Sequence, residues 1–195
     1  MEQLIALVAF SFAMAASPGP TNILLWASGA TFGLPRTLPF VLGTALGIGL
    51  MTLAAAAGLS VLVTAVPSIE TAMKVGGSAY LVYLAWQIAR AGTLQRPGVA
   101  RPFGLVAATG FQVINPKAWV FALGAVTTFR LTGLPTMLGS ALVPVVMMIV
   151  VVPSALLWVG AGNALGRLIS GPRGRRVVSL ALAALLVLSV GLVWV

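Results

Sequence analysis

The sequence predicts an all-α integral membrane protein, with six transmembrane helices arranged as two inverted three-helix repeats. Three observations support this fold class: the composition, the spacing of the long uncharged runs, and a match of the chain to itself at a constant offset. Hydrophobic residues make up 60% of the 195 residues, charged residues only 7%, and the mean hydropathy is +1.12. An average soluble domain has about 25% charged residues. The chain therefore has room for about six to seven spans of roughly 20 to 25 residues and for no sizeable soluble domain.

The charged and reactive residues exclude several classes of function. Eleven Lys and Arg residues against Glu2 and Glu70 give a net charge of +9, which we interpret as cytoplasmic loop charge rather than a nucleic-acid surface. The chain has no His, Cys or Asp, which removes imidazole and thiolate metal sites and every Ser-His-Asp arrangement. We therefore expect no enzyme activity, no cofactor, no bound metal and no nucleic-acid partner.

Long uncharged runs define the spans. The first 16 residues resemble a secretory signal, but this stretch carries Glu2 and no Lys or Arg, so we assign it to the first span rather than to a cleaved leader. The run at 131–166 is too short for two spans, so we expect one long helix kinked at Pro144 or Pro153. The six expected spans are residues 4–28, 38–66, 67–90, 103–129, 131–166 and 177–195.

Glycine and proline residues characterise the second span and the loop before it. Gly33, Pro35 and Arg36 are expected to form the first loop. Gly43-x-x-x-Gly47 gives the second span a smooth face on which another helix can approach closely. We interpret that face as close packing within the chain rather than as a dimer motif.

The distribution of basic residues predicts the orientation. Eight of them fall on one side of the expected spans, against Lys74 and Arg130 on the other. The positive-inside rule places the eight in the cytoplasm and both termini outside, which in a bacterial inner membrane means the periplasm. The eight are Arg36, Arg90, Arg96, Arg101, Arg167, Arg173, Arg175 and Arg176.

The first and fourth spans are predicted to be broken, at Pro18/Pro20 and at Pro116. Proline has no N–H to give to a helix, and its ring clashes with the carbonyl four residues back, so both sites open the backbone where lipid cannot hydrate it. Open backbone at membrane depth occurs only where protein buries it or where it lines a wet cavity. Paired interruptions in two halves of a chain therefore indicate the binding site of a transporter.

The chain matches itself at an offset of 96 residues. The offset superposes Pro20 on Pro116, Thr31 on Thr127 and Pro39 on Pro135, and residues 42–46 on residues 138–142. We interpret this as a duplication within a single membrane domain, with repeat one at about 1–96 and repeat two at about 97–195. Three spans per repeat is an odd number, so the two repeats must face opposite ways across the membrane.

Lys117 is the strongest candidate for substrate binding. A cation within a span costs roughly 2.5 to 3.5 kcal/mol on insertion scales, so Lys117 should face protein or water, where it would hold a substrate carboxylate. The alternative is that it reaches to a membrane interface. Pro20 and Pro116 can each begin a half-helix whose N–H groups point at an anion.

Polar neighbours of the two breaks complete the candidate site. Thr21, Asn22 and Asn115 would supply orienting hydrogen bonds, although capping of the broken backbone explains the two Asn residues equally well. A substrate ammonium would need carbonyl or amide oxygens, or aromatic faces, which can also be packing or interface anchors. The candidate substrate-binding residues are Pro18, Gly19, Pro20, Thr21, Asn22, Tyr80, Gln112, Asn115, Pro116, Lys117 and Trp119.

Three motifs, in this order, resemble the lysine-exporter (LysE/RhtB-type) translocators. They are Ser17-Pro-Gly-Pro-Thr-Asn-Ile-Leu-Leu, Lys74-Val-Gly-Gly-Ser-Ala-Tyr-Leu-Val-Tyr-Leu-Ala-Trp-Gln and Gln112-Val-Ile-Asn-Pro-Lys-Ala-Trp-Val-Phe. The resemblance implies a bacterial inner-membrane exporter of amino acids or related small metabolites, generally regarded as driven by the proton gradient. Many such proteins carry an acidic residue near the Pro-Gly-Pro, where this chain has Thr21 and Asn22.

These features predict a secondary transporter that works by alternating access and exports neutral rather than dibasic substrates. Lys117 is then the titratable candidate for the proton carrier, with facilitated diffusion or a Glu70–Lys74 pair as alternatives. The partners expected are a small-molecule substrate and membrane lipid, and a homo-oligomer stays open. The rival functions are a structural membrane subunit without transport and an intramembrane lipid-modifying enzyme.

Overall fold

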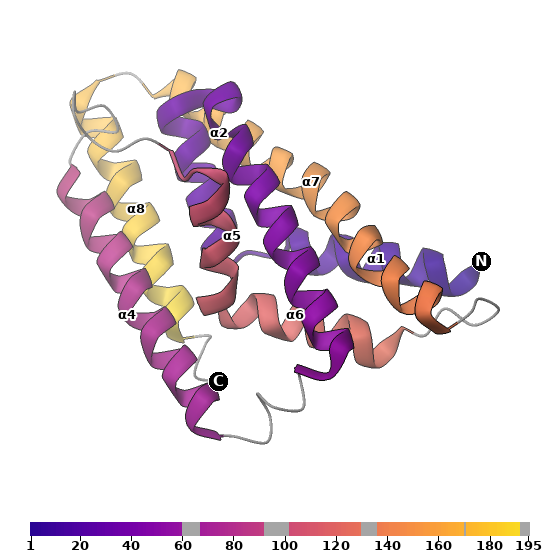
Figure 1. The fold of residues 1–195 in the computed structure, drawn as a ribbon. Coiled ribbons are helices and arrows are strands. Elements are labelled where there is room, and N and C mark those ends of the chain that lie inside the picture. The colour runs from indigo at the N-terminus through magenta and orange to yellow at the C-terminus, as the bar shows by residue number, and fades with distance from the viewer. Residues whose placement is uncertain (60–66, 92–101, 130–135, 170, 192–195) are drawn as a thin grey trace.

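The computed structural model describes residues 1–59, 67–91, 102–129, 136–169 and 171–191, and over these ranges all regular structure is helical (Figure 1). This confirms the all-α class. The segments Pro20–Gly58 and Ala141–Leu168 are long and apolar enough to cross a membrane. The elements are α1 (Glu2–Ala16), α2 (Pro20–Ala54), the short π-helix η1 (Ala55–Leu59), α4 (Pro67–Ala91), α5 (Leu105–Ile114), α6 (Pro116–Thr128), α7 (Thr136–Leu168) and α8 (Pro172–Gly191).

Both predicted helix interruptions are present. The helix α1 ends before Ser17, whose backbone is extended, and α2 begins at Pro20, which lies in the first turn of that helix. In the same way, α5 stops before an extended Asn115, and α6 starts at Pro116. Proline suits a first turn because the N–H that it lacks would have no helical partner there. Figure 1 shows that the second break is also a bend, with α6 turned away from the direction of α5.

The first predicted loop is reduced to a sharp turn inside α2. Gly33 has φ 77° and ψ 174°, a backbone conformation with positive φ that favours glycine, and it divides α2 into residues 20–32 and 34–54. The second expected span ran to residue 66, and its last part lies outside the described residues. Over its described part the fifth expected span is one long helix, because α7 continues through both Pro144 and Pro153. Residues 131–135 of that span lie outside the described residues.

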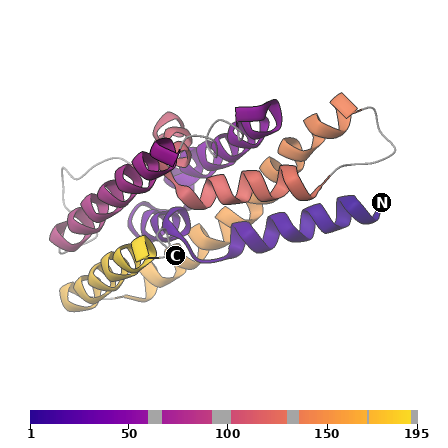
Figure 2. The same cartoon turned by 90° about the horizontal axis from the view of Figure 1, so that it is seen from below.

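The helices pack as two groups around α2. One buried cluster includes Phe40, Leu81 and Leu182, and joins α2 to α4 and α8. The other includes Leu7 and Met147, and joins α1, α6 and α7 to the later part of α2. Seen from below in Figure 2, α1 runs beside α6 on one side of the molecule and α4 beside α8 on the other. The two breaks therefore meet near the centre.

Glycines allow the closest helix contacts. A Cβ atom built on Gly162 would lie 2.0 Å from the Trp26 carbonyl oxygen, and one on Gly29 would lie 2.2 Å from the Val159 carbonyl oxygen, so α2 and α7 touch backbone to backbone. The Gly43-x-x-x-Gly47 face packs in the same way against α5, where a Cβ on Gly43 would lie 2.3 Å from a carbonyl oxygen. This confirms the expectation that the face serves packing within the chain.

The contact between α2 and α7 predicts a difference between two neighbouring glycines of the same helix. Gly162→Ala should lower the stability of the protein in detergent by about 1 to 3 kcal/mol, because the added methyl group must push backbone away from backbone. Gly160→Ala is the matched control, since nothing lies within 4 Å of a Cβ at that position. Thermal unfolding of both variants measures the effect, and equal midpoints would contradict it.

Candidate functional site

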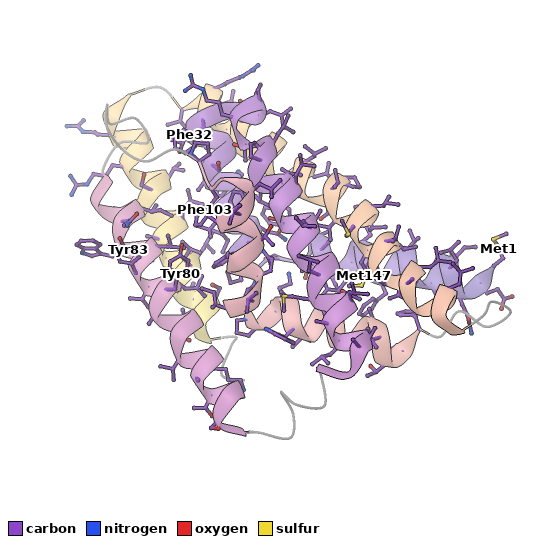
Figure 3. All side chains as sticks on the ribbon, in the orientation of Figure 1. Met1, Phe32, Tyr80, Tyr83, Phe103 and Met147 are labelled. Carbon is purple, nitrogen blue, oxygen red and sulfur yellow. The ribbon has the colours of Figure 1, made fainter. Side chains whose placement is uncertain are left out.

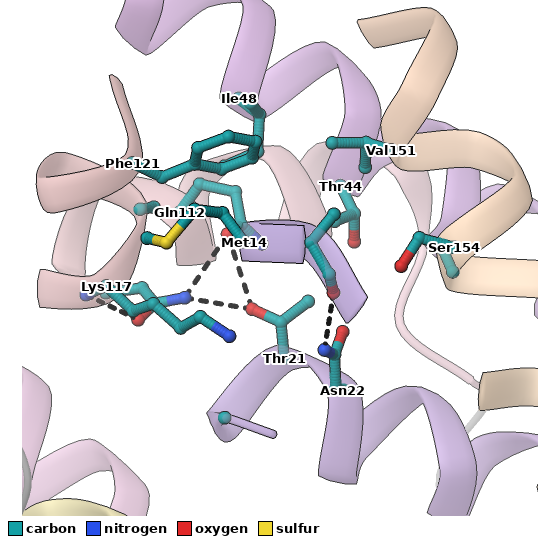
Figure 4. Close-up of a pocket in the computed structure, with 15 residues that line it drawn as sticks. Met14, Thr21, Asn22, Thr44, Ile48, Gln112, Lys117, Phe121, Val151 and Ser154 are labelled. Atoms are coloured by element: carbon teal, nitrogen blue, oxygen red, sulfur yellow. Dashed lines mark hydrogen bonds between the residues drawn. The ribbon is translucent and has the colours of Figure 1, made fainter. Parts of the chain in front are cut away.

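A cavity of about 40 Å³ lies where the two breaks meet (Figure 4). Its apolar lining is Met14, Ala15, Ile48, Ala118, Phe121, Val151 and Ala155. Its other lining residues are Gly19, Thr21, Asn22, Thr44, Gln112, Asn115, Lys117 and Ser154.

A short hydrogen-bond network joins the two breaks. The Asn115 side-chain amide donates to the Thr21 hydroxyl at 2.9 Å and to the Gln112 side-chain oxygen Oε1 at 3.3 Å, and the Thr21 hydroxyl donates to that same Oε1 at 3.3 Å. All three side chains are buried. Thr21 comes from the first break and the other two from the second, so the network fixes the two halves of the chain against each other.

Asn115 also caps the helix that begins beside it. Its side-chain oxygen accepts a hydrogen bond from the Lys117 backbone N–H at 3.2 Å, and its backbone oxygen accepts one from Ala118 N–H at 3.0 Å. The start of α6 is thereby satisfied. The start of α2 differs, because Gly19 supplies no side-chain cap.

Asn22 satisfies the carbonyl groups that the first break leaves open. Its side-chain amide donates to the carbonyl oxygens of Ala15 at 2.7 Å and Ser17 at 2.8 Å. The Ser17 hydroxyl covers a third carbonyl, that of Met14, at 2.9 Å. The capping role that the sequence allowed for both Asn residues is therefore present. The Asn22 side-chain oxygen faces the cavity without a donor among the described residues.

Lys117 reaches across from the second break to the first. Its ammonium donates to the carbonyl oxygen of Ser17 and, at 3.3 Å, to that of Pro18. An ammonium has three N–H donors, so one remains for the cavity that Lys117 lines. The side chain thus lies against protein rather than extending to an interface. Among the side chains that the structure describes, no carboxylate lines the cavity with it.

The structure brings six of the eleven candidate residues to the cavity wall: Gly19, Thr21, Asn22, Gln112, Asn115 and Lys117. Pro18, Pro20 and Pro116 shape the two breaks beside it.

Two aromatic candidates lie outside the cavity lining. Tyr80 packs on Phe111 with ring centroids 5.7 Å apart, and the Trp119 indole N–H donates to the Val113 carbonyl oxygen at 2.8 Å.

Sequence reasoning did not single out Thr44 and Ser154, which both line the cavity. Thr44 belongs to the segment that matches itself at the 96-residue offset, and Ser154 is an isolated hydroxyl directly after Pro153 in an apolar run. The feature of the sequence that could have identified these two residues is a hydroxyl side chain in the middle of an apolar span.

The geometry is that of a helical membrane translocator: two broken helices from different parts of the chain frame a cavity with polar and apolar walls, and a half-buried cation lies beside it. A sequence model of the LysE type translocator family matches residues 12–195, and the chain belongs to that family. No solved structure gives a significant match.

Several curated relatives are similar over part of the chain. A cysteine/O-acetylserine efflux protein of Klebsiella pneumoniae subsp. pneumoniae is 32% identical over 126 residues, which cover 65% of this chain and 64% of the relative. Proteins of the same name from Escherichia coli (strain K12) and Shigella flexneri are 30% identical over 123 residues, which cover 63% of each chain. The match therefore spans just under two thirds of these relatives.

Proposed function

We propose that the protein exports small neutral amino acids across the bacterial inner membrane by alternating access, with the cavity between the two breaks as its substrate site. The observation that carries the proposal is the crossing of Lys117 from the second break to the carbonyl groups of the first. A substrate carboxylate that competed for this ammonium would loosen a tie between the two halves. Substrate binding and rearrangement of the halves would then be one event.

The cavity wall offers partners for both ends of an amino acid. A carboxylate could accept from the Lys117 ammonium and from the first N–H groups of α2, which no side chain caps. The ammonium group could donate to the Asn22 side-chain oxygen, which has no other donor among the described residues. Two relatives named cysteine/O-acetylserine efflux protein support an amino-acid substrate.

The charge of the cavity favours neutral substrates. Lys117 contributes one positive charge, and no acidic residue is among the described residues that line the cavity. A second cation, on the side chain of lysine or arginine, would be buried there without a counter-ion, which is costly.

Several features support a duplicated, inverted arrangement of residues 1–96 and 97–195. Pro20 and Pro116 each begin a helix, and Thr31 and Thr127 each donate to the carbonyl four residues earlier at 2.8 Å. The helix contacts exchange as a two-fold relation requires: α1 packs on α7, α5 packs on α2, and α4 packs on α8. Three spans in each repeat would give the six-span topology.

The two halves differ where it matters for chemistry. Lys117 corresponds to Thr21 at the 96-residue offset, so of these two positions only the one in the second break carries a cation. A single cation in an otherwise related pair of breaks would give the substrate one preferred orientation.

The arrangement of the basic residues supports both termini outside the cytoplasm. The turn of α2, the end of α4, the end of α7 and the start of α8 gather at one end of the molecule, where nitrogen-tipped side chains project (Figures 1 and 3). The N-terminus lies towards the opposite end. The exposed residues Arg36, Arg167, Arg173 and Arg176 belong to that basic end, whereas Arg96 and Arg101 lie outside the described residues.

We expect a reporter enzyme fused after the last residue to work in the periplasm and to be silent in the cytoplasm, because the positive-inside rule holds the basic turns in the cytoplasm. A periplasmic phosphatase fusion and a cytoplasmic fluorescent fusion at the same position measure this. Cytoplasmic fluorescence without phosphatase activity would contradict the orientation.

The proposed function predicts selective efflux from proteoliposomes loaded with an equimolar mixture of amino acids. Serine, cysteine and alanine should leave faster than from loaded liposomes without the protein, whereas lysine and arginine should not, because the described cavity lining offers no carboxylate for a second cation. Mass spectrometry of the external medium measures each rate. Selective efflux of lysine and arginine would defeat the neutral-substrate proposal, and no efflux of any amino acid would favour a structural subunit.

A proton-coupled mechanism predicts a specific defect in Lys117→Arg. Arginine keeps the positive charge at any working pH but does not release a proton, so substrate binding should persist while the response of efflux to an imposed pH gradient is lost. Lys74→Arg is the matched control, since the chain has only these two lysines, and it also tests the Glu70–Lys74 alternative. Wild-type pH dependence in Lys117→Arg would remove Lys117 as the proton carrier.

A further inference from the structure

Two hydroxyl groups of the cavity wall have no hydrogen-bond partner among the described residues. Thr44 of α2 is 4% exposed and Ser154 of α7 is 1% exposed, and both line the cavity. Neither the Thr44 Oγ1 nor the Ser154 Oγ has a partner within the described structure. A buried polar group without a partner costs about 1 to 3 kcal/mol, so each such group calls for an explanation.

Thr44 stands apart from other threonines in these helices. In five threonines the side-chain hydroxyl donates to the backbone carbonyl oxygen four residues earlier, at 2.8 or 2.9 Å, so that the hydroxyl has a partner within its own helix. They are Thr31, Thr37, Thr52, Thr109 and Thr127. Thr44 does not make this bond. Its hydroxyl is left available to something inside the cavity.

The two hydroxyls lie at the far side of the cavity from the ammonium. In the view of Figure 4, Lys117 is drawn at one side of the cavity and Ser154 at the other, with Thr44 between them on the Ser154 side and with Ile48, Phe121 and Val151 along the wall. The cavity therefore has a charged, amide-rich end, an apolar wall and a second polar end that is neutral. That order matches a small amino acid with one polar atom at the tip of its side chain.

We propose that Thr44 and Ser154 form the side-chain subsite of the transporter, which recognises the hydroxyl, thiol or ester oxygen of a small neutral amino acid. This rests on the proposed function, since it takes the α-carboxylate to bind at the Lys117 end. A hydroxyl both donates and accepts, so the pair suits a substrate hydroxyl, a thiol or an acceptor-only ester carbonyl. An apolar side chain of the same size leaves both hydroxyls unpaired and is transported less well.

The test compares serine with 2-aminobutyrate, in which a methyl group replaces the hydroxyl. Purified protein in liposomes is loaded with both compounds, and the ratio of the two efflux rates is measured for the wild type, Ser154→Ala and Thr44→Val. The ratio should fall about tenfold in each variant, which corresponds to one lost hydrogen bond of roughly 1.4 kcal/mol. Thr44→Ser keeps the hydroxyl and should keep the wild-type ratio.

Ser179→Ala is the matched control. Ser179 is 1% exposed, its hydroxyl also has no partner within the described structure, and it lies on α8 away from the cavity lining. Its ratio should equal that of the wild type. Because each substitution removes a hydroxyl that makes no protein hydrogen bond, folding should survive, and 2-aminobutyrate efflux reports it within the same experiment.

The outcomes separate this inference from the proposed function. A wild-type ratio in both Ser154→Ala and Thr44→Val, or an equal loss of both rates, overturns the subsite while leaving neutral amino-acid export in place. A ratio that falls in Ser179→Ala as well overturns the subsite too. Absence of any amino-acid efflux from the wild type overturns the proposed function itself.

Discussion

The structure depends on one constraint: backbone opened within an apolar protein must be satisfied by the protein's own groups. Two prolines in the first break and one in the second end a helix where lipid can supply neither donor nor acceptor. Asn22, Ser17 and Lys117 together cover carbonyl oxygens at the end of α1, and Asn115 covers the start of α6. Without these side chains the breaks would carry unpaired polar groups, each costing several kcal/mol in a membrane.

The groups that stabilise the breaks are also the groups that face the cavity. Lys117 binds carbonyl groups of the first break and retains one donor, while Asn22 uses its amide for the break and leaves its oxygen to the cavity. Capping and ligand binding are therefore compatible roles of one side chain, as the sequence allowed. In the proposed transport cycle, a ligand that binds the Lys117 ammonium or the Asn22 side chain replaces one of the hydrogen bonds that cap the break. The ligand therefore changes the stability of the break.

Close helix contacts make this arrangement possible. Glycines at the crossing of α2 with α7, and at that of α2 with α5, let backbones meet with no side chain between them. The second crossing brings Gly47 against the stem of Gln112 and so places its amide within reach of Thr21. The packing of small residues thus sets the distance across which the two breaks interact.

The sequence by itself determined the helical class, both interruptions, the single long helix α7 and most of the polar residues at the cavity. These follow from local physics, because proline removes a backbone N–H and disfavours a helical conformation in the residue before it, and because uncharged runs limit the length of a span. It could not decide whether Asn22 and Asn115 cap the broken backbone. Nor could it show that Tyr80 and Trp119 lie outside the cavity lining, or that Thr44 and Ser154 lie within it. Those outcomes depend on which face each helix turns inward. Helices that are apolar nearly all round carry no periodic signal that reveals that face, so only the tertiary packing decides it.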